Sequence, residues 1–552
     1  MRVNIPARRP RNPLVLRTPE ELEDDVHKFY VRNHLEDVVA LELLVKGARI
    51  AQEPDNLYTL SLTSAEFKAI KDEKESGFWQ QSKDLKVTIL TTACAAITQG
   101  WQQSTINAGS RGWKYDLQPQ GEDWTRQHLL LGGFIDAAPW LSGSIIGTWL
   151  SDPLQEGNYG RRPALFISAV FCAACVLGTA RCVTWQQLLA CRVILGIGIG
   201  AKASIAPVFA AEAAVDHLRG RLLMMWQLFD TFGVFLGFAC DWIVDRQWRV
   251  LLGTASIPAL ILLFLVFLCP ESPRFLIRRG DYTGAFVSLR QLRGTDIQAA
   301  RDLYYIHSQL QVETEMFDGE RPQNWYSEEI YQKKVRETGF FKRLGKLFSH
   351  PRNQRACVAA FLVMASQQLC ARSTFFRFTL RNFSVQPPRR RRPIQMVPSN
   401  LRILGFGLAN FLFTIPAYRY IDWRGRRLLL LISLAGMFLS LLAIGFFFRI
   451  EIDKVSKVRL ALVSAFTIGF FTFFYGIGAG PVPFTFSAEV FPLAFREVGM
   501  SFSVMVNFLG LGLLVLFVPQ LTKALGQYGE SKLCFLFTWV FPRLSAACSV
   551  GF

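Results

Sequence analysis

The sequence predicts an all-α integral membrane protein with nominally twelve transmembrane helices arranged as two six-helix bundles. Of its 552 residues, 51% are hydrophobic and only 19% are charged, which is too apolar for an ordinary water-soluble enzyme. Apolar windows of about 20 residues, the length that crosses a bilayer as a helix, recur along the chain. An internal repeat divides these windows into two matching sets.

The first 85 residues are charged and polar and contain no signal-peptide apolar core, so we expect a cytoplasmic N-terminal segment at 1–85. An N-terminal six-helix bundle is expected over 86–270. The length and flanks of the apolar windows predict its spans near 87–108, 129–150, 163–182, 187–211, 222–243 and 250–269.

The segment 271–354 is polar, with alternating charge around Lys333 and Glu337, and predicts a cytoplasmic inter-bundle loop with short helices. The C-terminal bundle is expected over 355–552. Its candidate spans lie near 355–376, 400–420, 428–449, 458–486, 500–520 and 532–551, of which the first and last are weak.

The formal charge of +18 comes from basic residues between the spans, so membrane topology explains it better than nucleic-acid binding. With a cytoplasmic N-terminus, all the basic clusters lie inside, at 161–162, 219–221, 274–279, 341–355 and 424–427. The eleven cysteines lie in or beside apolar windows, and Cys172 and Cys175 have no second pair or suitably spaced histidine. We therefore expect no metal site and no cofactor.

Matching motifs in the two halves form the internal repeat. Asp152 and Gly160-Arg161-Arg162, after the second span, are repeated by Asp422 and Gly425-Arg426-Arg427, after the eighth. Glu212 and Arg219 end the fourth span seven residues apart, as Glu489 and Arg496 end the tenth. Two homologous six-helix halves would produce this pattern, which is typical of a transporter whose halves rock against each other.

These motifs resemble the signatures of the sugar porter family of the major facilitator superfamily. The segments that carry the resemblance are Gly160–Arg162, Arg192–Gly200, Pro207–Glu212, Pro270–Arg274, Gly425–Arg427 and Gly480–Glu489, and Trp149–Pro153 is most similar to fungal members. Together they span roughly residues 85 to 530. The resemblance implies alternating-access transport of a sugar or polyol, without covalent chemistry, by a monomer in the plasma membrane.

Polar side chains near the middle of the bilayer are costly and are candidates for substrate binding. In the resembling family, glutamines at the positions of Gln227, Gln367 and Gln368 hydrogen-bond sugar hydroxyls, which suits an amide that donates and accepts. Asn507 is a further candidate, and Phe484 replaces a tryptophan of many relatives but keeps a ring that can stack on a sugar. The alternative for each glutamine is an interhelical hydrogen bond.

Acids and bases at the cytoplasmic helix ends could pair across the two halves and hold an inner gate shut until substrate binding tips it open. The alternative is that these residues are topology signals at the membrane surface. The predicted gate set is Asp152, Arg161, Arg162, Glu212, Arg219, Arg274, Asp422, Arg426, Arg427, Glu489 and Arg496.

Three features depart from the family pattern. Proton-coupled relatives carry an acid in the first span, where this chain has Gln102, so we expect facilitated diffusion rather than symport. Asp230, another membrane acid, receives no role from the resemblance. The seventh span is interrupted at 372–398 by several arginines, and the short twelfth span contains Pro542 and Arg543.

Two explanations of these interruptions remain open: a diverged member, or a gene model that reads through an intron and ends early. We favour the second, because the resemblance is good on both sides of each break. The function alternative to a transporter is a transport-deficient sugar-binding sensor or degenerate member. A membrane enzyme lacks a nucleophile motif, a phosphate loop and a metal cluster.

Overall fold

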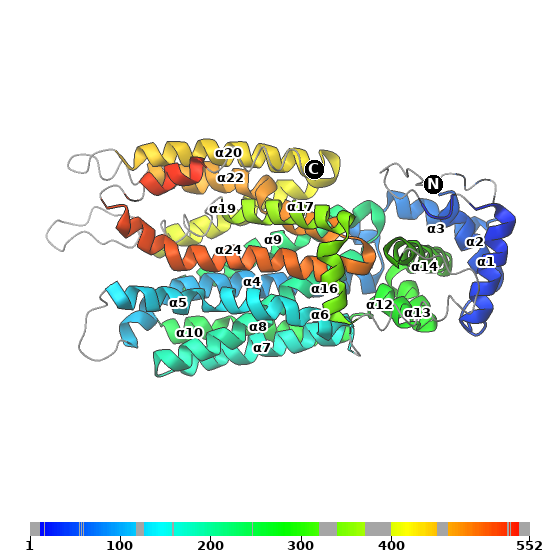
Figure 1. Ribbon diagram of the computed structural model, residues 1–552, viewed down its shortest axis with the longest axis horizontal. Coiled ribbons are helices and arrows are strands. Elements are labelled where there is room, and N and C mark those ends of the chain that lie inside the picture. The colour runs from blue at the N-terminus through cyan, green and yellow to red at the C-terminus, as the bar shows by residue number, and fades with distance from the viewer. Residues whose placement is uncertain are drawn as a thin grey trace.

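The computed structural model describes residues 12–539 except for 16, 55, 57, 59, 118–125, 157–158, 245–246, 319–338, 370–398, 450–461, 527–528 and 530. The predicted interruption at 372–398 therefore lies outside the described residues, as do Pro542 and Arg543. The described elements are all helical. Figure 1 shows a long bundle with a group of shorter helices at one end, which we call the inner end because the sequence predicts it to be cytoplasmic.

The first half of the bundle comprises the helices between the N-terminal segment and residue 268. They are α4 (Lys83–Asp116), α5 (Arg126–Ser142), a π-helical segment (Gly143–Gly147), α6 (Thr148–Glu156), α7 (Arg161–Arg181), α8 (Trp185–Ala213), α9 (Arg219–Val244), α10 (Trp248–Thr254) and α11 (Ser256–Leu268). Side-chain oxygens of Ser82 and Thr184 cap the first turns of α4 and α8.

The second half is built from α17 (Pro351–Leu369), α19 (Ser399–Trp423), α20 (Arg426–Phe447), π-helical segments at Phe466–Phe471 and Tyr475–Ala479, α22 (Thr472–Phe474), α23 (Pro481–Val490) and α24 (Arg496–Ala524). Residues 531–539 form a further helix, which packs on α20. Contacts across the halves pair α5 with α24 and α9 with α19. Since the repeat equates α5 with α19 and α9 with α24, these two interfaces are the pair that a two-fold relation requires.

Eight helical stretches in the described part of the chain are long and apolar enough to cross a membrane. They are Leu130–Gln155, Arg161–Arg181, Trp185–Ala213, Asp216–Val244, Trp248–Leu268, Arg426–Phe447, Leu462–Val490 and Leu493–Ala524. These eight agree with eight of the twelve spans that the sequence predicts. The first and eighth predicted spans correspond to α4 and α19, which are long helices within the bundle but are not among these eight stretches.

The N-terminal segment and the inter-bundle loop pack together into one helical cap at the inner end (Figure 1). Its helices are α1 (Pro19–Arg32), α2 (Leu41–Gln52), α3 (Ser64–Glu75), α12 (Pro273–Arg279), α13 (Tyr282–Arg293) and α14 (Asp296–Asp318). Phe29 of α1 lies against Tyr282 and Tyr304, with ring centroids 5.2 and 5.7 Å apart, inside an apolar core of the cap's own. The sequence predicts both segments but not their association.

Candidate substrate cavity and inner-end latch

A polar cavity with about 470 Å³ of empty space lies between the two halves. The first half contributes Gln99, Gln103, Trp140, Trp226, Gln227 and Asp230; the second contributes Gln367, Gln368, Tyr475, Phe484, Asn507, Phe508 and Leu511. All five substrate residues that the sequence predicts therefore lie in the lining of one cavity. Their role in binding stays a prediction.

Amides of the second half are linked to one another on their side of the cavity. Gln367 donates from Nε2 to the Tyr475 hydroxyl at 3.2 Å and to the Gly480 carbonyl at 3.0 Å. Asn507 donates to Gln367 Oε1 and accepts from Gln368 Nε2 at 3.0 Å. The three amides are thus held in one orientation, which fixes the donors and acceptors that a ligand would meet.

The first half presents less satisfied groups. Gln227 Nε2 and Gln99 Oε1 are buried and have no hydrogen-bond partner among the described residues. One is a donor and the other an acceptor, so together they match a hydroxyl group, which both donates and accepts. Because an unpaired buried polar atom costs about 1 to 3 kcal/mol, a polyhydroxylated ligand would be stabilised here.

Aromatic rings close the cavity. Phe484 lies against Trp226, with centroids 6.0 Å apart and planes inclined by 36°, and Trp140 meets Phe508 edge-on at 5.5 Å. A sugar presents C–H groups on one face, so such rings can stack on it while the amides bind its hydroxyls. The sequence did not single out the two tryptophans as candidates, although Trp226 directly precedes Gln227.

Gln102 does not line this cavity. It is buried inside the first half beside Arg192, around a smaller cavity of about 250 Å³. Asp230, which the sequence left without a role, is the one carboxylate among the described residues that line the central cavity. The carboxylate that lines the central cavity is therefore on α9, whereas Gln102 of the first span lies outside that cavity.

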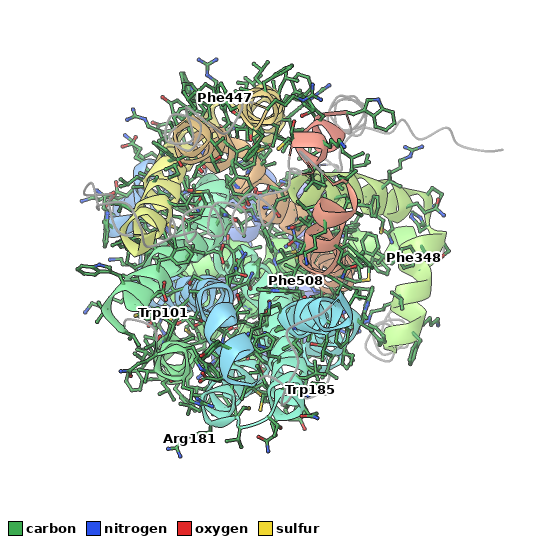
Figure 2. The ribbon with its side chains drawn as sticks, turned by 90° about the vertical axis from the view of Figure 1, so that its left-hand side faces the viewer. Trp101, Arg181, Trp185, Phe348, Phe447 and Phe508 are labelled. Carbon is green, nitrogen blue, oxygen red and sulfur yellow. The ribbon has the colours of Figure 1, made fainter. Side chains whose placement is uncertain are left out.

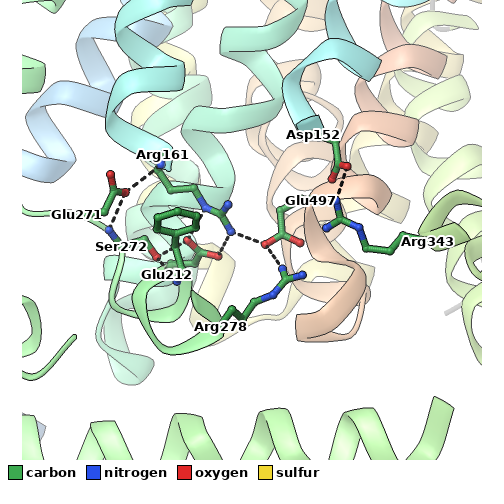
Figure 3. A network of polar contacts seen from close by, with 9 residues as sticks. Asp152, Arg161, Glu212, Glu271, Ser272, Arg278, Arg343 and Glu497 are labelled. Carbon is green, nitrogen blue, oxygen red and sulfur yellow. Dashed lines mark hydrogen bonds and ion pairs between the residues drawn. The ribbon is translucent and has the colours of Figure 1, made fainter. Parts of the chain in front are cut away.

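Figure 3 shows the ion-pair network that joins the halves at the inner end, which we call the latch. Arg161, the first residue of α7, is fully buried and binds Glu212 of α8 through Nε and Nη2 at 3.1 and 3.0 Å. Its Nη2 also pairs with Glu497 in the first turn of α24, across the two halves. Arg278 of α12 adds a second cation to Glu497 at 3.1 Å.

The N-terminus of α7 is held by Glu271. Its carboxylate accepts from the backbone N–H groups of Arg161 at 2.9 Å and Arg162 at 3.3 Å, which suits the positive end of a helix dipole. Burial nevertheless raises the pKa of the Glu271 carboxyl above its usual value. Gly160 precedes the helix with φ of +93°, a conformation that glycine adopts without strain.

The matching motif of the second half also reaches the opposite half. Asp422 at the end of α19 lies 3.4 Å from Arg221 in the first turn of α9, the equivalent of the first turn of α24. Arg426 pairs with Asp422 at 3.6 Å and with Glu489 at 2.9 Å. Each repeat motif thus contacts the equivalent helical turn of the other half. The first motif supplies the base and the second supplies the acid.

The other predicted gate residues lie elsewhere around the inner end. Arg162 donates to the carbonyls of Val266 and Phe267, and Arg219 to the carbonyl of Ala211, all within the first half. Asp152 pairs with Arg343 of α16 (Phe340–Ser349) at 2.8 Å. Arg274 is in α12, Arg427 is the second residue of α20, and Arg496 begins α24. Pairing across the halves is seen for Arg161, with Glu497, and for Asp422, with Arg221. The gate role of the predicted set stays a prediction.

Two matched helical halves, a polar cavity between them and a latch at one end define a membrane transport protein. The chain belongs to the sugar (and other) transporter family, whose sequence model matches residues 88–542. It is accordingly a multi-pass membrane protein of the major facilitator fold and not an enzyme.

Curated relatives and solved structures agree with this family. The arabinose-proton symporter of Escherichia coli (strain K12) is 26% identical over 77% of this chain and 80% of its own length. Putative polyol transporter 1 of Arabidopsis thaliana is 28% identical, over 66% and 70%. A solved structure of the proton:xylose symporter XylE bound to 6-bromo-6-deoxy-D-glucose gives a TM-score of 0.68 at 20% identity, over 84% of this chain and 94% of that one.

Proposed function

We propose that this protein moves a sugar or polyol across the plasma membrane by alternating access, as a monomer. The observation that carries the proposal is the central cavity, which is lined by amides from both halves. The two halves must move apart for this cavity to open. The names of the curated relatives, an arabinose symporter and polyol transporters, support this substrate class. The latch would hold the inner end closed until the loaded cavity changes the balance between states.

We propose facilitated diffusion as the mode of transport. The amide of Gln102 cannot take up and release a proton, and it lies outside the central cavity. Asp230 provides a specific reason to test the alternative of proton symport, because its carboxylate lines the cavity. A transport-deficient sugar-binding member is the remaining alternative.

The test is uptake of a panel of labelled sugars and polyols in transporter-deficient cells. Gln227→Ala removes one cavity donor and should raise the half-saturating concentration about tenfold, the effect of about one hydrogen bond. Gln520→Ala is the control, because that amide donates to the Leu516 carbonyl of its own helix at 3.3 Å. If the protein reaches the surface and no substrate enters, the transport proposal fails.

The coupling mode is tested by the same assay with an imposed pH gradient. Facilitated diffusion predicts that the internal substrate concentration reaches and does not exceed the external one. Accumulation that Asp230→Asn abolishes would assign symport to Asp230 instead. Binding of substrate without uptake would favour the transport-deficient alternative.

A further inference from the structure

Helix α16 lies across the direction of the bundle, on the side of its inner end (Figure 1 and Figure 2). Its protein-facing side is formed by Leu347, which is fully buried, and Arg343, which pairs with Asp152 at 2.8 Å. Leu347 belongs to an apolar cluster with Phe491 and Val498 of the second half. The helix is thus held in place on one side.

A second side of α16 carries exposed aromatic rings. Phe341 is 84% exposed and Phe348 46% exposed, and their separation of seven residues, two helical turns, puts them on the same side. The Phe348 ring meets Phe502 edge-on at 5.5 Å, and Phe502 belongs to the membrane-crossing stretch Leu493–Ala524. The exposed rings therefore lie level with the inner end of a membrane span, at the rim of the bundle, as Figure 2 shows for Phe348.

A third side and the turn that follows are basic. Lys342 is exposed and Lys346 partly exposed on α16, and Arg352 and Arg355 are exposed in the first two turns of α17. Residues 340–355 contain no acidic side chain, and the one arginine that turns inward, Arg343, is neutralised by Asp152. The segment therefore presents positive charge directly beside exposed rings.

We propose that α16 binds acidic phospholipids of the inner leaflet. Phe341 and Phe348 enter the boundary between headgroups and acyl chains, while Lys342 and Arg355 face the anionic headgroups, as in helices that lie in a membrane interface. A lipid surface fits better than an acidic protein, because the rings lie at the depth of a membrane span. Arg343 is on the same helix as these residues. Lipid bound to α16 therefore keeps Arg343 in its ion pair with Asp152 and stabilises the closed inner end.

The test measures thermal unfolding of the full-length purified protein in detergent, with added phosphatidylinositol or phosphatidylcholine. Phosphatidylinositol should raise the unfolding temperature and phosphatidylcholine should not. Each basic residue near an anionic surface strengthens binding about fivefold, so Lys342→Gln with Arg355→Gln should require roughly 25-fold more phosphatidylinositol for the same shift. Both residues are exposed, so the variant should fold normally and match the wild type without lipid.

Lys68→Gln with Lys71→Gln is the matched control, because it removes the same charge from the exposed side of α3 in the cap. This control should respond as the wild type does. Phe341→Ser should weaken the response without changing the charge. An equal response in the two double variants, or the same shift from inositol phosphates that lack acyl chains, would overturn the proposal.

Discussion

Gly160 and Gly425 occupy matching positions before α7 and α20, and both have positive φ, +93° and +81°. A methyl group added at Gly160 would lie 2.7 Å from Glu271 Oε2, whereas one added at Gly425 would meet nothing within 4 Å. Gly425→Ala should therefore cost about 2 kcal/mol, because Gly425, with ψ of 158°, lies in a region of φ and ψ that is essentially restricted to glycine. Gly160→Ala should cost about 3 kcal/mol, because it also displaces the carboxylate that holds α7.

The two substitutions are compared by thermal unfolding of the purified variants in one detergent. Equal losses of stability would show that the Glu271 side chain can move away from the added methyl group at no cost in stability. Its contact with the α7 terminus would then be unimportant for stability.

Glu497 is the acid on which the cross-half part of the latch depends, since both Arg161 and Arg278 face it. Glu497→Gln keeps the shape of the side chain but removes a buried charge that faces the fully buried Arg161. We expect a loss of about 3 kcal/mol, measured by thermal unfolding. Asp216→Asn is the control, because the Asp216 carboxylate is 83% exposed in its pair with Arg219 and should matter by less than about 1 kcal/mol.

The sequence repeat explains why Arg161 could be predicted and Glu497 could not. Repeat reasoning finds residues that match between halves, such as Glu212 and Glu489. Glu497 corresponds to Gly220 in the first half, so no symmetry marks it. The Arg161–Glu497 contact uses a position where the repeat is broken, and that position becomes visible only once the helices are packed.

At the scale of the helices, α4 and α9 approach so closely that only glycine fits between them. A Cβ atom at Gly100 would lie 2.0 Å from the Asp230 carbonyl, whereas one at Gly109 of the same helix would lie 3.5 Å from Leu252. Gly100→Ala should therefore force the helices apart and cost about 3 kcal/mol. Gly109→Ala should be neutral or stabilising by up to about 1 kcal/mol, because alanine favours a helix.

Thermal unfolding compares these two alanine variants. Cavity binding provides a second measurement, because Asp230 lines the central cavity and should move with α9. A Gly100→Ala protein as stable as the wild type would contradict the close packing of these helices.

Apolar windows predicted most of the helices because lipid selects for uniformly apolar surfaces. The same criterion is less successful for α4, because Gln99 and Gln103 turn inward to the cavity and lower the apolar content of the helix. Glutamines that line a cavity thus weaken the signal of the span that carries them. The five predicted substrate residues came from a family resemblance, and periodicity alone would not have separated them from interhelical hydrogen bonds.

At the scale of the whole molecule, the cap joins segments that are more than 200 residues apart in sequence, so no local pattern could predict it. Its attachment to the bundle is specific: Ser82 donates to the Leu292 carbonyl at 2.7 Å, and Arg293 to the Ala213 carbonyl at 2.8 Å. Arg278 extends from the same region into the latch. Partial unfolding of the cap should therefore also weaken the latch at the inner end of the bundle.

The core of the cap contains His307. Its Nδ1 atom shares a hydrogen bond with the Tyr282 hydroxyl at 3.0 Å, and its ring centroid lies 4.5 Å from that of Phe29. Burial lowers the pKa of His307 from 6.5 to about 4, despite the nearby Asp25. Between these values the unfolded cap binds a proton and the folded cap does not. The contribution of His307 to stability is therefore complete above pH 6.5 and is lost as the pH falls toward 4.

By pH 5 the resulting loss amounts to about 2 kcal/mol, because this pH lies about 1.5 units below 6.5 and each unit corresponds to about 1.4 kcal/mol. Hydrogen exchange of the cap helices at pH 7 and pH 5, corrected for the intrinsic rate, measures it. In the wild type, protection of α1 and α14 should fall more at pH 5 than protection of α8 does. His307→Phe keeps an aromatic ring against Phe29 but cannot titrate. In this variant the protection of α1 and α14 should fall no more at pH 5 than that of α8. An unchanged difference in this variant would mean that other groups cause the acid sensitivity, and that the cap tolerates a charged imidazole in its core.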